Sequence, residues 1–224
     1  MVARTSSAAR TTRRLLGCGM VAGPLFVGAF LVEGALRPEY DPLRHPVSSL
    51  SLGPGGWTQR LNFLVTGGLY VAGAIGLWRA RHQPGLATRA GPILLSTIGL
   101  GLMGAGVFAS DPINGFPPGT PDAPVSTTVG RLHDLFSSPV FLCLPAAAIV
   151  YARAAARAGD RPWVLGSVGV AVAQFGTFVA AGFGFSQHPA LINVGGAFQR
   201  ASLIVGFGWL SGLCARAWRG SRDT

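Results

Sequence analysis

The chain has 224 residues, of which 49% are hydrophobic and only 12% are charged, and its mean hydropathy is +0.44. This composition excludes an ordinary water-soluble domain, because apolar stretches long enough to cross a bilayer recur along the chain. A formal net charge of +10 also occurs in nucleic-acid-binding proteins, but here the basic residues are spread over short connections between apolar stretches, so we expect no nucleic-acid partner.

Six apolar segments follow one another, and we interpret each as a membrane-spanning helix. A basic tail over 1–14 precedes them and a short tail over 218–224 follows, so the transmembrane domain is expected over 15–217. About 18 apolar residues in a helix match a hydrocarbon core of about 30 Å. The predicted spans cover about 15–35, 60–78, 91–110, 134–153, 162–184 and 196–216.

The distribution of Arg predicts the orientation of these spans. With the N-terminus in the cytosol, 13 of the 18 basic residues, all of them Arg, lie in cytosolic segments, as the positive-inside rule requires. Six spans then return the chain to its starting side. We therefore expect an all-α six-helix bundle in a plasma (inner) membrane, with three hairpins that close outside, both termini cytosolic, and membrane lipids as partners.

The first outer connection contains an unusual concentration of polar residues. Residues 40–50, with the sequence YDPLRHPVSSL, hold Asp, Arg, His, two Pro and two Ser. Asp41-Pro42 is typical of a turn or of the first residues of a helix, and Pro46 keeps any helix there short. We predict a turn that lies over the mouth of the bundle and shields His45 and Ser48.

The second outer connection, 111–126, has the sequence DPINGFPPGTPDAPVS and contains five Pro. It therefore cannot form regular helix or strand. A flexible linker and an ordered cap over the bundle are the two alternatives. The length of the connection favours the cap, since long loops in compact proteins usually have a function.

Helix rise places several charged residues near the outer edge of the membrane. Arg200 lies slightly below that edge, where a charge needs a partner. We expect Asp111 as its counter-charge, or Glu33 as second choice, while an Arg200 that reaches lipid phosphates is the alternative. His133 is expected to border the same pocket. Asp134 next to it has a plainer explanation as the N-terminal cap of the fourth helix.

These residues suggest one polar pocket at the outer face. Its expected members are Asp41, His45, Ser48, Asp111, His133 and Arg200. Catalysis there would use His45 as a base and Ser48 as a nucleophile or substrate-orienting group, with Asp111 and His133 as further candidates. A zinc ion is a second hypothesis, since His and carboxylates from separate helices form catalytic zinc sites. The candidate zinc ligands are His45, Asp111, His133 and His188.

Small residues suggest close helix packing. Gly19 and Gly23 form one GxxxG pair, and Gly208 and Gly212 form another. Such pairs let two helix backbones approach each other in lipid. Packing inside the bundle and a dimer interface are the alternatives, of which internal packing is favoured, and the oligomeric state stays open.

Three segments together carry a resemblance to a known family. They are RPEYDPLRHPVSSLSLG at 37–53, GRLHD at 130–134 and GGAFQR at 195–200, with an Asp-Pro and Pro-rich loop between the first two. Over about 15–215 the chain resembles the bacterial membrane proteins grouped as domain of unknown function 998. The resemblance implies a six-helix membrane protein and leaves its activity open.

Three functions remain. The favoured one is a non-catalytic membrane protein that binds a lipid or small molecule at its outer face, with a hydrogen-bonded polar network that fixes the loops over the bundle. The alternative is a metal-dependent membrane hydrolase acting on a lipid. It loosely resembles the seven-helix ceramidase and adiponectin-receptor-like hydrolases, but this chain has six spans and no paired His on the last one. A transporter is the further alternative.

Overall fold

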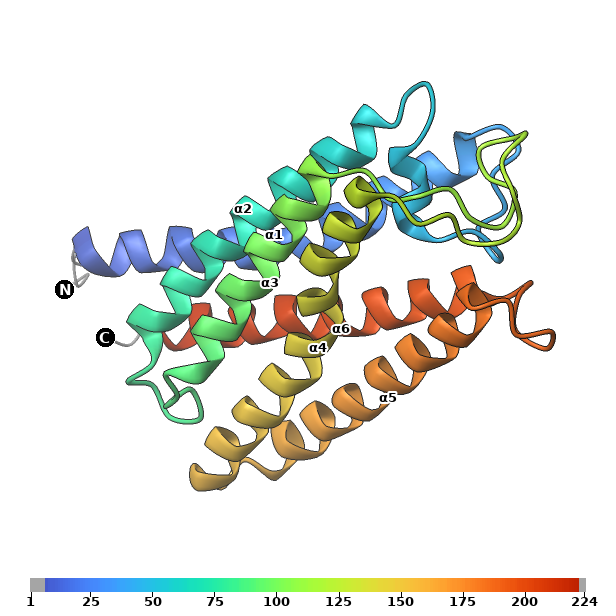
Figure 1. Cartoon of the computed structure of the whole chain (residues 1–224). Coiled ribbons are helices and arrows are strands. Elements are labelled where there is room, and N and C mark those ends of the chain that lie inside the picture. The colour runs from blue at the N-terminus through green and yellow to red at the C-terminus, as the bar shows by residue number, and fades with distance from the viewer. Residues whose placement is uncertain (1–6, 222–224) are drawn as a thin grey trace.

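The computed structural model describes residues 7–221, and within them the regular structure is helical. Six α-helices are each long and apolar enough to cross a membrane, so the chain is a multi-pass membrane protein (Figure 1). They are α1 (Ser7–Leu36), α2 (Trp57–Ala80), α3 (Ala90–Val107), α4 (Thr128–Arg157), α5 (Arg161–Phe185) and α6 (Gly195–Gly220), and a short 3-10 helix, η1, covers Val47–Ser51.

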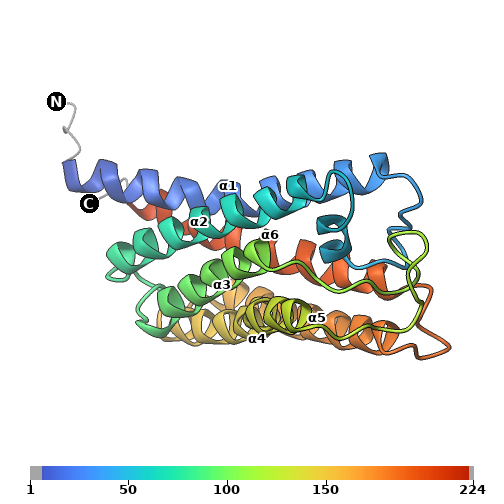
Figure 2. The same cartoon turned by 45° about the horizontal axis from the view of Figure 1, so that its top comes forward.

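The helices form a single bundle in which each one packs against its neighbours in the chain, and α1 also packs against α6. The described termini lie at one end of the bundle, which we call the terminal end (Figures 1 and 2). The long connections 37–56, 108–127 and 186–194 gather at the opposite end, which we call the loop end.

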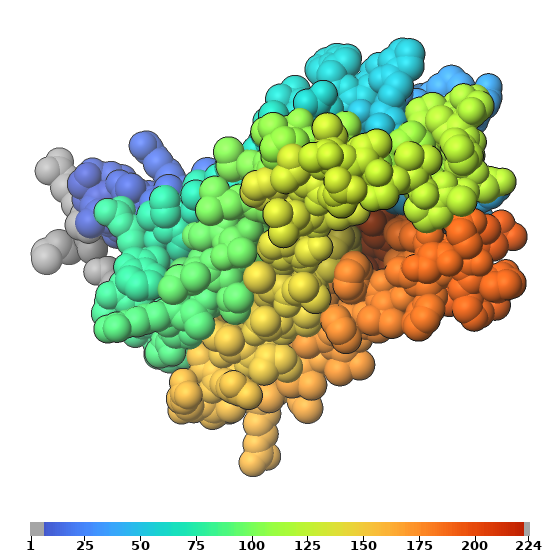
Figure 3. Space-filling view, viewed as in Figure 1, coloured from blue at the N-terminus to red at the C-terminus, as the bar shows by residue number. Residues whose placement is uncertain are grey.

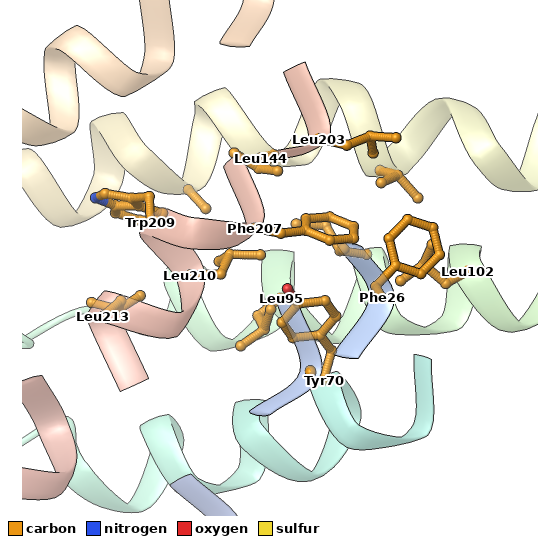
Figure 4. Close-up of a cluster of buried hydrophobic side chains, with 14 of the residues drawn as sticks. Phe26, Tyr70, Leu95, Leu102, Leu144, Leu203, Phe207, Trp209, Leu210 and Leu213 are labelled. Atoms are coloured by element: carbon orange, nitrogen blue, oxygen red, sulfur yellow. The ribbon is translucent and has the colours of Figure 1, made fainter. Parts of the chain in front are cut away.

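The core is built from aromatic and branched side chains in the middle of the bundle (Figure 4). The Phe26 ring centroid lies 5.2 Å from that of Phe207 and 5.4 Å from that of Phe63. Large apolar side chains such as Leu25 and Val172 are exposed on the outside of the bundle. Apolar residues inside and outside are what a lipid environment requires, since lipid chains are as apolar as the core.

The two GxxxG pairs differ in their surroundings. A side chain at Gly19 would meet Gly73 of α2, and one at Gly23 would meet the backbone of Phe207 in α6. This pair therefore serves packing inside the bundle, which is the alternative that the sequence favoured. Gly208 has no neighbouring atom within 4 Å of an added Cβ, so the second pair is not enclosed in the same way.

Several helix ends differ from the sequence prediction, among them α1, which begins at Ser7 and not near 15, and two of the differences bear on the site. α3 ends at Val107, before the predicted limit at 110, and α4 begins at Thr128, before the predicted start at 134. The Thr127 hydroxyl accepts the backbone N–H of Gly130 at 3.0 Å and so caps α4. Asp134 lies in the second turn of α4, so the interpretation of Asp134 as the cap is wrong.

α4 and α5 meet near the terminal end, where the short connection 158–160 joins them. Toward the loop end the two helices separate (Figure 1). This separation leaves room for side chains of α3 and α6 to reach the space between them, and it positions the site described next.

Candidate functional site

Arg200 lies in the second turn of α6, and only 8% of its surface is exposed. Its guanidinium donates hydrogen bonds to the carbonyl oxygens of His45 at 3.0 Å and Gly196 at 3.1 Å. It also donates to the Pro42 carbonyl and to the Tyr40 hydroxyl. The side chain therefore faces the bundle, and neutral acceptors surround its charge.

The predicted carboxylate partner of Arg200 is wrong. Glu33 pairs with Arg37 at 2.5 Å, and Asp111 accepts hydrogen bonds from Thr127. The physical reason lies in the loop backbone, which turns several carbonyl oxygens toward the guanidinium. Their partial negative charges solvate a group that cannot lose its proton, so no counter-ion is needed at this position.

The start of α6 holds the first loop in this conformation. The Ala197 N–H donates to the Leu43 carbonyl at 2.9 Å, which satisfies one of the free donors of the helix N-terminus. A side chain at Gly196 would overlap carbonyl oxygens of the loop, so only Gly allows this close approach. The Gln199 side chain accepts the Val47 N–H at 2.8 Å. The GGAFQR segment thus forms the support for the loop.

Tyr40 links this loop to Arg200. Its hydroxyl donates to the Pro46 carbonyl at 2.8 Å and accepts from Arg200. Burial raises the pKa of Tyr40 to about 12, although the nearby Arg200 charge acts in the opposite direction. The hydroxyl consequently keeps its proton and remains a donor. The ring packs edge-on against Phe116 of the second loop, with 5.2 Å between centroids.

His45 joins the first two loops through both ring nitrogens. Nδ1 accepts the Asp41 backbone N–H at 2.9 Å, and Nε2 lies 3.1 Å from the Asn114 carbonyl oxygen. This pattern requires a neutral ring with its hydrogen on Nε2. Burial lowers the pKa of His45, while the bond to Asn114 opposes that shift. The site therefore favours the neutral ring.

Asn114 anchors the Pro-rich loop. Its side-chain amide donates to the Arg44 carbonyl at 3.1 Å, and its side-chain oxygen accepts from Gln187 at 2.7 Å. Arg44 and Asp122 add an ion pair of 2.7 Å. The second loop is therefore held over the first as a cap and is not a free linker. Tyr40, His45, Asn114 and Arg200 together are called the loop cluster below.

A second polar region lies beside the loop cluster. It is a cavity of about 380 Å³ bounded by helices α1 to α6 and by the first two loops, and we call it the lateral cavity. In the space-filling view a hollow lies between α4, in yellow, and α5, in orange, and the red surface of α6 forms its floor (Figure 3). The cavity thus opens through the side of the bundle, where α4 and α5 separate.

One face of α4 gives the lateral cavity a graded lining. Asp134 lies nearest the loop end, and Ser137 and Ser138 follow about one turn below. Phe141 lies deeper, and its ring stacks on Phe178 of α5 with 4.5 Å between centroids. The wall therefore changes from carboxylate to hydroxyl to aromatic side chains over about 10 Å.

Asp111 lies beyond the end of α3 and fixes the start of α4. Its carboxylate accepts the Thr127 backbone N–H at 2.8 Å and the Thr127 hydroxyl at 2.6 Å. Gly130 faces this carboxylate, and a Cβ there would overlap it. Asp111 therefore contributes a negative charge to the cavity and holds Thr127 in its capping conformation.

His133 is buried between α3 and α4. Its Nδ1 lies 3.1 Å from the Ala105 carbonyl oxygen and 2.9 Å from that of Phe108. Two acceptors at Nδ1 require the hydrogen there, so His133 donates to free carbonyls at the C-terminus of α3. In the neutral ring Nε2 then carries a lone pair, on a side chain that lines the cavity.

The single pocket predicted from sequence is divided into two. Ser48, Asp111 and His133 line the lateral cavity. His45 and Arg200 belong to the loop cluster, and the Asp41 backbone donates to His45 there. The candidates for base and nucleophile, His45 and Ser48, are consequently on opposite sides of this division.

Sequence reasoning missed several residues of both regions. Tyr40 and Asn114 carry no signal beyond their place in Pro-rich loops. Ser137 and Ser138 could have been noticed as a polar pair inside the apolar fourth span, and the polar pair follows Asp134 at helical spacing.

The predicted zinc ligands do not fit a metal site. Both nitrogens of His45 are in hydrogen bonds, and both oxygens of Asp111 contact Thr127. His188 is exposed in the loop between α5 and α6, and its Nδ1 accepts the Ala190 N–H at 3.3 Å. Across residues 7–221, no three His, Cys, Asp or Glu side chains are grouped as a metal site would require.

Comparison with known proteins gives one match. A family model described as "Protein of unknown function (DUF998)" matches residues 20–216. No curated protein and no solved structure matches the chain. The matched segment contains the whole loop cluster and every residue that lines the lateral cavity.

Proposed function

The chain belongs to DUF998, a family of proteins of unknown function, and we propose that this multi-pass membrane protein binds an amphipathic lipid or lipid-like small molecule in the lateral cavity. The observation that carries the proposal is the graded wall of about 10 Å from Asp134 to Phe141. A cavity of about 380 Å³ has the size of a small-molecule site. Its polar end suits a head group and its aromatic end suits an acyl chain.

The loop cluster supports entry from the membrane. His45, Asn114 and Arg200 tie the loops together over the end of the bundle, through bonds from α6 and from both loops. The cavity opens between α4 and α5, on a surface that we place in lipid. A ligand already dissolved in the bilayer would reach this opening without leaving the apolar phase.

We further propose that the loop end faces outward and that both termini are cytosolic. The short loops 81–89 and 158–160 lie at the terminal end, where most Arg are found, and the positive-inside rule puts such loops in the cytosol. Reporter fusions after Arg81 and after Gly119 are expected to report cytosol and exterior respectively. Reports from the same side would contradict this orientation.

The hydrolase alternative receives less support from the geometry. The Ser137 and Ser138 hydroxyls donate to the Asp134 backbone carbonyl, at 3.3 Å and 2.6 Å. Within residues 7–221 neither hydroxyl has a hydrogen bond to the His133 ring, so no activated nucleophile is assembled. Binding requires only the lining that is present.

A cavity-filling variant tests the proposal. Gly182 lines the lateral cavity, and an added Cβ there meets no atom within 4 Å. Gly182→Phe therefore adds an aromatic ring at the cavity wall, and the Cβ of the new side chain has room. We expect at least tenfold weaker binding of a fluorescent monoacylglycerol, measured by titration of purified protein in phosphatidylcholine nanodiscs.

Gly176→Phe is the matched control for this titration. Gly176 lies on the same helix, has no atom within 4 Å of an added Cβ, and is absent from the cavity lining. This variant is expected to bind like the wild type. Equal binding by the wild type and Gly182→Phe would refute the lateral cavity as the binding site.

A further inference from the structure

We infer that the ligand of the lateral cavity carries an ammonium head group, and that the cavity selects against an anionic phosphate. This inference rests on the proposed function and specifies the chemistry of its ligand. It follows from the charges, the free hydrogen-bonding atoms and the position of the carboxylates along α4.

The charges at the polar end of the cavity have one sign. Asp111 and Asp134 both line it, and the described lining residues include no Arg or Lys. Arg residues at this end of the bundle have other partners: Arg44 pairs with Asp122, Arg131 donates to Ser126 and Thr128, and Arg200 belongs to the loop cluster. A phosphate in this place would face two carboxylates without a counter-charge, whereas an ammonium group would be attracted to both.

Along α4 the free hydrogen-bonding atoms are acceptors. The Asp134 carboxylate has no hydrogen bond or ion pair with any other residue in 7–221. In the neutral ring of His133, with its hydrogen on Nδ1, Nε2 offers a lone pair, and within residues 7–221 no hydrogen bond is made to it. The Ser137 and Ser138 hydroxyls already donate to a backbone carbonyl and retain accepting lone pairs. A head group rich in N–H donors complements this set.

Position along the helix fits a single amphiphile. Asp134 is exposed near the loop end, and the stacked rings of Phe141 and Phe178 lie about 10 Å deeper. An ammonium group beside Asp134 therefore places an attached alkyl chain along Ser138 toward the aromatic rings. The same arrangement leaves the charged end close to the proposed membrane surface, where it is least costly.

Three amphiphiles with one chain length test the inference. Dodecylamine (protonated at pH 7), dodecyl phosphate and the neutral monododecyl glycerol would each displace the fluorescent monoacylglycerol from protein in phosphatidylcholine nanodiscs. Displacement from nanodiscs holding Gly182→Phe gives the baseline for partitioning into lipid. We expect dodecylamine to act at a concentration at least tenfold below that of dodecyl phosphate, with monododecyl glycerol between them.

Asp134→Asn tests the assigned carboxylate. The variant should lose most of the preference for dodecylamine over dodecyl phosphate. Asp122→Asn is the control, because Asp122 is a loop carboxylate outside the cavity lining. The control variant should keep the full preference. A preference that survives in Asp134→Asn would overturn the assignment.

Other outcomes separate the inference from the proposed function. Binding of monododecyl glycerol with no preference for dodecylamine would overturn the ammonium head group and leave the lateral cavity as a binding site. Failure of all three amphiphiles to displace the probe beyond the Gly182→Phe baseline would overturn the proposed function itself.

A bilayer aminolipid and a free single-chain amine share this head-group chemistry. Repeating the titration in nanodiscs that contain a two-chain primary-amine lipid without phosphate distinguishes the two sources. A weaker apparent affinity for dodecylamine there would identify the bilayer lipid as a competitor for the site. An unchanged affinity would identify the free amine as the ligand.

Discussion

The loop cluster and the lateral cavity lie next to each other at the loop end, yet they treat polar groups in opposite ways. In the loop cluster Arg200, His45 and Asn114 bond almost entirely to one another and to loop carbonyls. In the lateral cavity the Asp134 carboxylate and the His133 Nε2 accept no hydrogen bond from any residue in 7–221. Polar side chains that share one membrane depth therefore need not form one site.

The difference has a thermodynamic consequence. A buried polar group without a partner is costly, so the loop cluster can stabilise the fold only while it is complete. Asp134, Ser137 and Ser138 of the cavity wall are more exposed and can exchange their contacts for those of a ligand. We expect substitutions in the loop cluster to change stability, and substitutions that line the cavity to change binding.

The largest expected effect is at Arg200. Arg200→Met keeps the length of the side chain but removes its donors, so buried acceptors such as the Pro42 carbonyl and the Tyr40 hydroxyl lose the hydrogen bonds that Arg200 donates. Each such group costs about 1–3 kcal/mol, so we expect the free energy of unfolding to fall by about 3 kcal/mol or more. Thermal unfolding in detergent measures the loss.

Arg131→Met is the control for this substitution, since Arg131 is an exposed Arg on α4. Its effect should stay within about 0.5 kcal/mol. Similar small losses in both variants would mean that the loop cluster does not stabilise the protein, and the comparison with the cavity would fail.

A smaller effect is expected where the cavity wall begins. Gly130→Ala places a methyl group against the Asp111 carboxylate, which Thr127 already fixes. Overpacking of this kind costs about 1–3 kcal/mol. Gly176→Ala has open space and should be neutral or slightly stabilising. Equal unfolding temperatures for Gly130→Ala and Gly176→Ala would show that the start of α4 is not rigid.

The smallest effect is a pH dependence that belongs to the loop cluster. The pKa of His45 in the folded protein lies below its ordinary value because of burial. At pH values below this ordinary pKa of about 6.5, His45 binds a proton in the unfolded chain that it does not bind in the folded chain. Stability should therefore fall as pH decreases from about 7, by at most about 1.4 kcal/mol per pH unit.

Two His variants assign this pH dependence. His45→Gln should reduce the slope of unfolding temperature against pH, although it also lowers stability at pH 8. His188→Gln removes an exposed ring and should leave the slope unchanged. A slope that persists in His45→Gln would place the titrating group outside the loop cluster.

The sequence predicted the helices better than the site. Six apolar segments are found as six helices capable of crossing a membrane, because in lipid the backbone must satisfy its own hydrogen bonds. Two of the expected pocket residues are in contact, since Arg200 of α6 donates a hydrogen bond to the His45 carbonyl in the first loop. The orientation of the helices in the membrane, and the side on which the hairpins close, remain predictions from the Arg distribution.

The partners within the network could not be predicted from residue types. Arg200 bonds to backbone carbonyls, and their directions depend on the loop conformation and not on the identity of Pro42 or His45. Asp111 was expected at the end of the third helix. Because α3 ends at Val107, Asp111 instead reaches Thr127 and the start of α4. A shift of a few residues in one helix end thus changed the assigned partner.

The contact between α1 and α6 has a consequence for biosynthesis. Helices enter the membrane in chain order. The face of α1 at Gly19 and Gly23 therefore packs against α6 only after α6, the last helix, has been made. The same helix brings Arg200 to the first loop. A nascent chain that stops before Gly195 therefore leaves this loop without its donor. Completion of synthesis and closure of the loop end become one event, so finished and unfinished chains differ in a way that membrane quality control can detect.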